Sequence, residues 1–320
     1  MTVLPLQAPP LSFGGPVNAS GTIGGSVVID PTNFIGRAAL FRGNQVTLIP
    51  PQPGEQFAFV IALNDNDTAL VWSFTDTGAT FVLYRDGTPT PINFRQNITA
   101  SYFPFVFTAG FCRCLNNNQL IDGTSYFGFN GDRAFRLNTR NGLGTILDPF
   151  PGDPTENLAW GEAINQAGDV LGYSFKIGRP YHERIGVWGS NGVFYTYLVE
   201  NESSNGLLFN DNKLIVITSF DSQGGPPISY IVPRPGVRLN LADLVVNLPA
   251  GQDLARIKDL NNHGDMIGSS TSSANFLLLR LESGDQQAYA TPVVDNTWHA
   301  LPSAVTIMRG RLRQQAGPAK

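Results

Sequence analysis

The sequence predicts an all-β protein, and more narrowly a six-bladed β-propeller of four-stranded antiparallel blades. Composition is the first observation: 34 glycines and 23 prolines in 320 residues, with only 14% charged residues, indicate many turns and few solvated helices. The second is a series of short alternating runs rich in Val, Ile, Phe, Tyr and Thr, which are typical of strands. The third is a short phrase that occurs six times.

The repeated phrase is centred on an asparagine, as in "AINQAGDVLGYS" and "DLNNHGDMIGSS". The residue before the asparagine is always apolar, Gly stands seven residues after it in four copies, and Ser stands nine residues after it in five. Successive copies are 45 to 52 residues apart, which suits a propeller blade and is too long for one coil of a β-helix. The six positions are Asn18, Asn64, Asn116, Asn165, Asn210 and Asn261.

Each copy of the phrase is expected to form a hairpin. Asparagine caps a turn by bonding to its own backbone, and the Gly or Asp that follows it tolerates a positive φ angle. The later glycine lies within the second strand, where a missing side chain indicates a bulge or another backbone close by. We therefore interpret the six asparagines as structural.

A second hairpin follows each asparagine, and its first strand is expected to end 18 to 23 residues after it. Turn sequences such as RDG, SNG and ESG support these hairpins. Two hairpins supply four strands to each unit. Aromatic residues five positions before the asparagine are expected to pack between blades in four units, namely Phe13, Phe59, Phe111 and Trp160.

Residues 1–301 are expected to form a single six-bladed propeller. Residues 302–320 hold a further strand, "VTIMRGRL", and a basic tail. This strand either closes the ring beside the N-terminal blade or begins another module.

The best copies, "AINQAGDVLGYS", "DLNNHGDMIGSS", "RAFRL" and "GVWGSNGVFYTYL", resemble the HAF family of extracellular repeats found in bacterial surface and secreted proteins. The resemblance extends from residue 11 to about residue 294, although the His of the family's motif is missing from every copy. It implies a propeller-like fold and an extracellular or cell-surface location. The family carries no established catalytic residues, so none is transferred to this chain.

Composition argues against several kinds of partner. The net charge is −4 and basic residues are scattered before the tail, so no nucleic-acid surface is indicated. No run of eighteen apolar residues exists, so the chain is not expected to span a membrane.

Cys112 and Cys114 are expected to be buried, unpaired thiols. The Asn- and Asp-rich turns at 64–67 and 211–213 lack the full ligand pattern of a calcium loop, so neither a metal nor a cofactor is expected.

Three charged residues are binding candidates on the innermost strands. Arg113, Glu162 and Lys258 each stand three residues before the asparagine of their unit, on strands expected to line the central channel. Structural pairing across the axis is the alternative interpretation.

Five further binding candidates lie in expected loops. The segment 95–110 is longer than the repeat requires and carries Tyr102, Phe103 and Phe105. Repeat proteins tend to bind through such insertions, although these aromatic residues equally suit an extra inner strand. His182 and Glu183 belong to a polar loop between the two hairpins of the fourth unit.

These observations favour a noncatalytic extracellular module that binds a protein or a glycan, or assembles with copies of itself. Two alternatives stay open. A propeller glycosidase or lyase with its site at the channel requires an acidic pair with arginine neighbours. A structural subunit of a surface layer or filament requires a large apolar contact on an edge strand or terminus.

Overall fold

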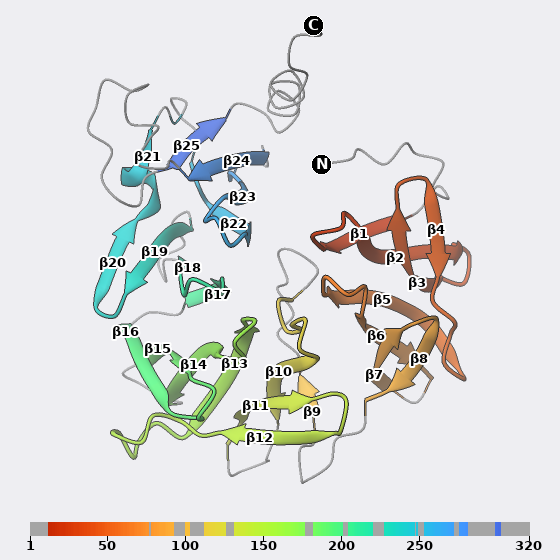
Figure 1. Cartoon of the computed structure of the whole chain (residues 1–320), viewed down its shortest axis with the longest axis horizontal. Helices are drawn as coiled ribbons and strands as arrows, with labels where there is room; N and C mark the ends of the chain where they lie inside the picture. The colour runs from red at the N-terminus through yellow and green to blue at the C-terminus, as the bar shows by residue number, and fades with distance from the viewer. Residues whose placement is uncertain are drawn as a thin grey trace, which may run out of the picture. The chain divides into compact units, whose positions relative to one another are not determined.

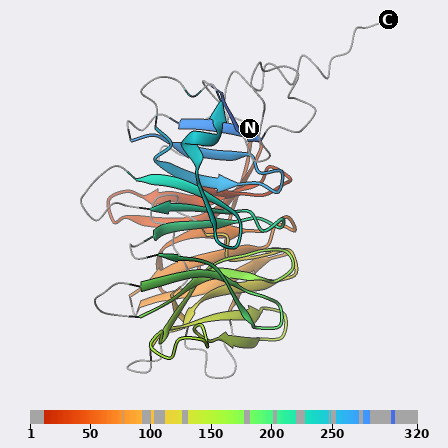
Figure 2. The same cartoon turned by 90° about the vertical axis from the view of Figure 1, so that its left-hand side faces the viewer.

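The computed structural model describes residues 12–76, 78–92, 100–102, 112–125, 131–176, 182–200, 204–219, 227–246, 248, 253–271, 275–280 and 298–301. These residues form six sheets, which are the blades of a six-bladed β-propeller, so the predicted fold class is confirmed (Figure 1). Figure 2 shows the same sheets from the side. The described residues contain no helix of the length and apolarity that crossing a membrane requires.

Blades 1 and 2 follow the predicted order of two hairpins each, and blade 3 departs from it in its first strand. Blade 1 contains β1 (Ser12–Val17), β2 (Ile23–Asp30), β3 (Ile35–Arg42) and β4 (Gln45–Leu48). Blade 2 contains β5 (Glu55–Leu63), β6 (Ala69–Thr75), β7 (Gly78–Arg85) and β8 (Thr88–Pro91). Blade 3 contains β9 (Ala100–Tyr102), β10 (Leu120–Ser125), β11 (Arg133–Asn138) and β12 (Leu143–Leu147).

The other three blades include one five-stranded sheet. Blade 4 contains β13 (Leu158–Ile164), β14 (Val170–Lys176), β15 (His182–Trp188) and β16 (Phe194–Glu200). Blade 5 contains β17 (Ser204–Phe209), β18 (Ile215–Ser219), β19 (Ile228–Arg234) and β20 (Val237–Asn240), followed by the 3-10 helix η2 (Leu241–Leu244). Blade 6 contains β22 (Arg256–Leu260), β23 (Met266–Ser269), β24 (Asn275–Arg280) and β25 (Trp298–Leu301), and β21 (Val245–Val246) pairs in parallel with β25.

The chain comprises two compact units, and the boundary between them crosses blade 4. Unit 1 contains Met1–Pro151, Asn157–Gly172 and Trp188–Val193. Unit 2 contains Gly152–Glu156, Tyr173–Val187 and Phe194–Lys320.

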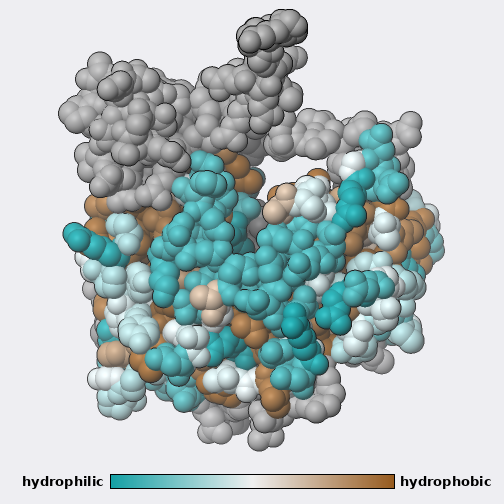
Figure 3. Space-filling view, in the orientation of Figure 1, coloured by the Kyte–Doolittle hydropathy of each residue, from teal (hydrophilic) through white to brown (hydrophobic). Residues whose placement is uncertain are grey.

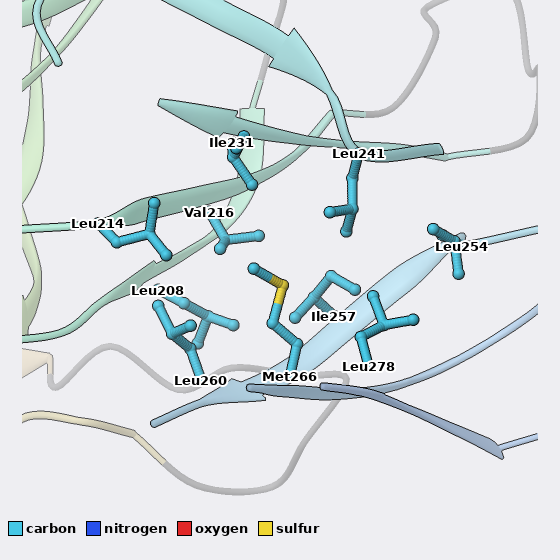
Figure 4. Close-up of a cluster of buried hydrophobic side chains, with 10 residues drawn as sticks. All are labelled: Leu208, Leu214, Val216, Ile231, Leu241, Leu254, Ile257, Leu260, Met266 and Leu278. Carbon is cyan, nitrogen blue, oxygen red and sulfur yellow. The ribbon is translucent and has the colours of Figure 1, made fainter. Parts of the chain in front are cut away.

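Apolar side chains from neighbouring blades form the cores. In unit 1, one cluster joins blades 1 and 2 around Leu40 and Val60, and another joins blades 2 and 3 around Leu70 and Phe135. In unit 2, nine buried residues of blades 5 and 6 and the segments that flank them surround Met266, which is completely buried (Figure 4). Burial between sheets supplies the main stabilising free energy, as sheet-on-sheet packing requires.

The repeated phrase forms the same turn in all six copies. The N–H three residues after the asparagine donates to the asparagine carbonyl, and the N–H of the asparagine donates to the carbonyl four residues after it. This is the pattern of a three-residue hairpin loop that ends in a left-handed residue. The residues with positive φ are Gly21, Asp67, Gln119, Gly168, Lys213 and Gly264.

The later glycine of the phrase allows two backbones to approach closely, as predicted. A Cβ added at Gly25 would lie 2.1 Å from the carbonyl oxygen of Phe13, and one added at Gly172 would lie 1.9 Å from that of Trp160. A side chain at either position would push the innermost strand away from its neighbour.

Several expectations need correction. The innermost strand of blade 3 is reduced to isolated bridges at Arg113 and Leu115, and β9 pairs with the far end of β10 instead. In blade 6 the described strand that follows β24 and pairs with it is β25, and the residues directly after the ESG turn lie outside the described residues. The predicted strand within 302–320 lies outside the described residues.

The aromatic spacers and the cysteines also differ from expectation. Phe13 and Trp160 are 53% and 38% exposed, so only Phe59 of the described three packs against a core between blades. Cys112 and Cys114 are buried as expected but form a disulfide, with Cα atoms 5.2 Å apart. The prediction of unpaired thiols was therefore wrong, because that separation lies within the range a disulfide accepts.

Candidate functional site

Asparagine side chains connect consecutive turns in unit 1. The side-chain amide of Asn18 donates to the main-chain carbonyl of Asn64 at 3.0 Å. Asn64 donates in the same way to Asn116 at 3.0 Å, and Asn116 to Asn165 at 2.9 Å. The repeated asparagine thus does more than close its own turn, since it also carries a hydrogen bond from one blade to the next.

Unit 2 repeats this connection between blades 5 and 6. The side-chain amide of Asn210 donates to the carbonyl of Asn261 at 3.0 Å. One residue further along, the N–H of Asp211 donates to Oδ1 of Asn262 at 3.0 Å, and Nδ2 of Asn262 donates to the Asp211 carboxylate at 2.6 Å. The turns are therefore structural junctions.

The carboxylates of the 64–67 turn take part in the same connections. Asp65 accepts hydrogen bonds from the N–H of Ala19 and from Nδ2 of Asn117, both at 2.8 Å. Asp67 accepts from Asn18 at 2.8 Å and forms an ion pair with Arg42. The acidic character of this turn is explained by bonds to the blades on either side.

Two of the three predicted channel residues lie on neighbouring strands of unit 1. Arg113 forms a parallel bridge with Ala163, and the N–H of Ile164 donates to the Arg113 carbonyl at 3.0 Å. Glu162, next to Ala163 on β13, is half-buried, as is Arg113. Lys258 is half-buried on β22 of unit 2.

A buried acid lies near Glu162 and was not predicted from the sequence. Asp122 on β10 is completely buried, and within the part of the chain that the structure describes neither of its carboxyl oxygens has a hydrogen-bond partner. Burial first, and then the nearby charge of Glu162, raise the pKa of Asp122 well above its ordinary value. Gly161 leaves room for the group, since a Cβ there would lie 3.1 Å from Oδ2 of Asp122. Because Asp122 has no exposed surface, a substrate in solvent cannot reach it in this conformation.

The loop candidates occupy strand ends. Tyr102 is the last residue of β9, and Phe103 and Phe105 lie outside the described residues. His182 is the first residue of β15. Glu183 follows it in the strand and is only 4% exposed, so it does not project from a polar loop as expected.

The serine nine residues after the asparagine is explained by a buried acid. In blade 4, the Ser174 hydroxyl donates to Glu156 at 2.5 Å, and Arg184 binds the same carboxylate at 2.9 Å. In blade 2, the Ser73 hydroxyl donates to Glu55 at 2.6 Å. In both blades the hydroxyl reaches the start of the innermost strand and holds it against the second strand.

A groove of about 440 Å³ lies in unit 1 between the β7–β8 hairpin of blade 2 and the β11–β12 turn of blade 3. Thr68 and Gln119, both buried, lie at its base, with Leu83 on one wall. Exposed Arg85 and Arg140 line its opening. Two arginine residues therefore line a groove whose described lining contains no carboxylate.

The equivalent position between blades 1 and 2 is closed by an ion pair. Arg42 ends β3, and its Nε donates to Oγ1 of Thr22 at 3.1 Å. Its guanidinium also pairs with the carboxylate of Asp67, which stands three residues after Asn64. One arginine thus joins the two turns.

Between blades 2 and 3 the same repeat positions hold a different combination of residues. Arg85 is the last residue of β7, as Arg42 is the last residue of β3. The two arginines are equivalent because the residues before them, Tyr84 and Phe41, pair with equivalent positions of β6 and β2. The position of Asp67 is occupied by Gln119, whose Nε2 donates to Oγ1 of Thr68 at 3.0 Å. The side-chain amide of Gln119 is uncharged and cannot form an ion pair with Arg85. Among the described residues, Arg85 pairs with Asp86 at 3.5 Å, and the side chain of Asp86 is 90% exposed.

The space between blades 3 and 4 is filled by another arginine. Arg136 occupies the repeat position of Leu83, because it lies opposite Asp122 as Leu83 lies opposite Leu70. Its guanidinium donates to the carbonyl of Gly168 at 2.6 Å and to that of Ser190 at 2.8 Å. At both neighbouring junctions of unit 1 an arginine therefore bonds to a group of the next blade, whereas the ion pair of Arg85 among the described residues is with Asp86 of its own hairpin.

This groove was not predicted from the sequence, although a signal for it was present. Aligning the six copies places Asp67 and Gln119 at the same position, three residues after the asparagine. Only the structure reveals that Asp67 binds an arginine from the preceding blade, so the significance of the change to glutamine could not be seen from composition or spacing.

No family model and no curated protein matches this sequence, so the resemblance to HAF repeats stays a prediction. Among solved structures, the chain is similar to a puromycin hydrolase mutant complexed with PGG, with a TM-score of 0.52 and 10% identity, over 83% of this chain and 45% of that one. It is also similar to YCF48 bound to D1 peptide (TM-score 0.49, 9% identity, 92% of this chain and 82% of that one). A third similar structure is the Cps50 (Swd1) β-propeller domain of Myceliophteria thermophila (TM-score 0.42, 8% identity, 82% of each chain).

The chain spans 45% of the puromycin hydrolase chain and 60% of TolB from Acinetobacter baumannii, which it also resembles, with a TM-score of 0.47 and 14% identity over 81% of this chain. At such low identity the likeness concerns the fold alone.

Proposed function

We propose that this chain is a noncatalytic, extracellular binding module that engages a protein partner at the groove between blades 2 and 3. The observation that carries the proposal is the contrast between that groove and the closed positions on either side. In the groove, Arg85 faces Thr68 and Gln119 without the carboxylate that Asp67 supplies to Arg42. A partially apolar groove with a few polar groups is the ordinary form of a binding site.

An extracellular location is supported by two features. The repeats resemble those of surface and secreted proteins. Cys112 and Cys114 form a disulfide, and disulfides form and persist mainly in oxidising compartments. Hydrophilic residues cover much of the described surface on the face shown in Figure 3, as expected for a protein in water.

Catalysis is the weaker alternative. Asp122 and Glu162 are the acidic pair beside an arginine that a glycosidase or lyase would need, but Asp122 is completely buried. A general acid must come within hydrogen-bond reach of the group it protonates. The pair is more simply explained as part of the packing between β10 and β13.

The proposal is tested by filling the groove. Thr90 lines it from β8, and Thr88 lies on the same strand but does not line it. The chain and its Thr90→Tyr and Thr88→Tyr variants are immobilised and probed with peptide, protein and glycan arrays, while light scattering measures self-association. We expect Thr90→Tyr to lose a protein or peptide ligand that Thr88→Tyr retains. Ligands bound equally by both variants would place the site elsewhere.

A further inference from the structure

We propose that the groove between blades 2 and 3 binds the carboxylate of an acidic peptide segment, held between Arg85 and Arg140. This inference rests on the proposed binding function and specifies its ligand. It rests on a comparison of the residues that occupy equivalent positions in successive blades.

The junction of blades 1 and 2 shows what Arg85 lacks. Arg42 there binds Thr22 and the carboxylate of Asp67. In the groove the arginine and the threonine are kept, as Arg85 and Thr68, while the carboxylate position holds a glutamine amide. A ligand carboxylate in the groove would take the place that Asp67 has beside Arg42, with the charge and shape to which a guanidinium bonds best, and would compete with the exposed Asp86, 3.5 Å from Arg85.

Arg140 adds a second positive charge at the opening. It stands in the turn between β11 and β12, and Thr139 beside it is held by two bonds to the Gln119 carbonyl, at 2.9 Å from its N–H and 3.0 Å from its hydroxyl. The base of the groove and the turn that carries Arg140 are thereby joined. A carboxylate that enters would meet two cations and no described anion on the lining.

The remaining lining favours a peptide over a sugar. Leu83, Pro91 and Ile92 form an apolar surface on which the methylene groups of a glutamate can lie, and the hydroxyl of Thr90 and the amide of Asn141 can bond to a peptide backbone. The described lining contains no aromatic ring, on which the apolar face of a sugar would stack. A volume of about 440 Å³ accommodates one or two side chains rather than a folded surface.

The test uses short capped, fluorescently labelled peptides that carry glutamate, glutamine or lysine at otherwise identical positions, with a galacturonate oligosaccharide as the sugar probe. Fluorescence anisotropy, and calorimetry for the sugar, measure their affinity for the full chain. We expect the glutamate peptide to bind. Arg85→Gln and Arg140→Gln should each lower the affinity for this peptide about ten- to hundredfold, as loss of a charge-assisted hydrogen bond does. Raising the salt concentration should weaken it as well.

Two further variants make the test specific to the mechanism. Gln119→Asp places in the groove the carboxylate found at Asp67, so it should bind Arg85 internally and compete with the ligand. Arg42→Gln removes an arginine of the same repeat position that does not line the groove, and it should leave the affinity unchanged. Circular dichroism establishes that each variant is folded.

The outcomes separate the two proposals. Equal binding of the glutamate and glutamine peptides, or affinity that is insensitive to both Arg85→Gln and Arg140→Gln, would overturn the carboxylate inference while leaving a binding module in place. Binding of galacturonate in preference to the peptides, lost in Arg85→Gln, would overturn the peptide assignment. Failure of every peptide, protein and glycan to bind counts against the binding function itself.

Discussion

The side-chain amide of Asn64 donates to the main-chain carbonyl of Asn116, which stands 52 residues away at the same position of the next blade. Its Oδ1 atom accepts the N–H groups of Asn66 and Thr68 in its own turn, at 3.0 and 2.9 Å. One buried side chain therefore shapes a hairpin and ties it to the neighbouring blade.

Replacing Asn64 with alanine should lower the free energy of unfolding by about 1–3 kcal/mol, because buried donors and acceptors lose their partner. Asn261→Ala is the matched control, since Asn261 is exposed and its described side-chain bonds are to Asp265 of its own turn. Urea denaturation measures both. Equal losses in the two variants would show that the bond from blade to blade adds nothing.

Gly25→Ala should destabilise blade 1 by about 1–3 kcal/mol, the usual cost of forcing an atom into a packed site. The added Cβ would lie 2.1 Å from the Phe13 carbonyl oxygen, so β1 has to move away from β2. Gly14→Ala is the control, because the nearest atom would be 4.0 Å away, and it should stay within about 0.5 kcal/mol of the parent. The melting temperatures of both variants are compared with that of the parent. An unchanged melting temperature for Gly25→Ala would contradict the close approach of β1 and β2.

The blades could be predicted because their signals are local. An asparagine, a left-handed residue three positions later and apolar flanks define a hairpin within a few residues, and repeating it six times predicts the architecture. Glu183 was misplaced for a related reason. Its polar neighbours suggested a loop, but Glu183 is buried on β15, and Arg184 beside it binds Glu156, which lies 28 residues earlier in the chain.

The contacts that define the candidate site depend on pairs of turns and could not be predicted. Nothing near Gln119 in the sequence reveals that Asp67, its counterpart, bonds to Arg42. Asp122 likewise appears as an ordinary strand residue, because its burial depends on packing against β13.

Arg184→Gln should destabilise the protein by about 3–5 kcal/mol, because it leaves a buried carboxylate without its cation. The side chain of Glu156 has no exposed surface, and Arg184 binds it at 2.9 Å. Arg85→Gln is the control, since its ion pair with Asp86 is exposed and should contribute no more than about 1 kcal/mol. Denaturant midpoints of the two variants provide the comparison, and similar values for both would be inconsistent with a buried ion pair at Glu156.

Asp122 should make the protein less stable as the pH rises. Its pKa in the folded chain is raised well above the ordinary value of 3.8, to which the unfolded chain returns. Between these two values the folded state holds a proton that the unfolded state has lost, so the contribution to stability is complete below about pH 4 and declines as the pH rises through the folded pKa. Asp122→Asn, which keeps the shape and cannot ionise, should remove this decline and exceed the parent in stability at the alkaline end.

Glu162→Gln should shift the decline to lower pH, because the negative charge of Glu162 helps to raise the pKa of Asp122. Unfolding free energies of the parent and both variants, measured by urea denaturation from pH 4 upward, provide the comparison. If the parent and Asp122→Asn share one pH profile, Asp122 does not hold its proton in the folded protein. The interpretation of its burial would then be wrong, since a carboxylate without hydrogen-bond partners cannot remain ionised there at small cost.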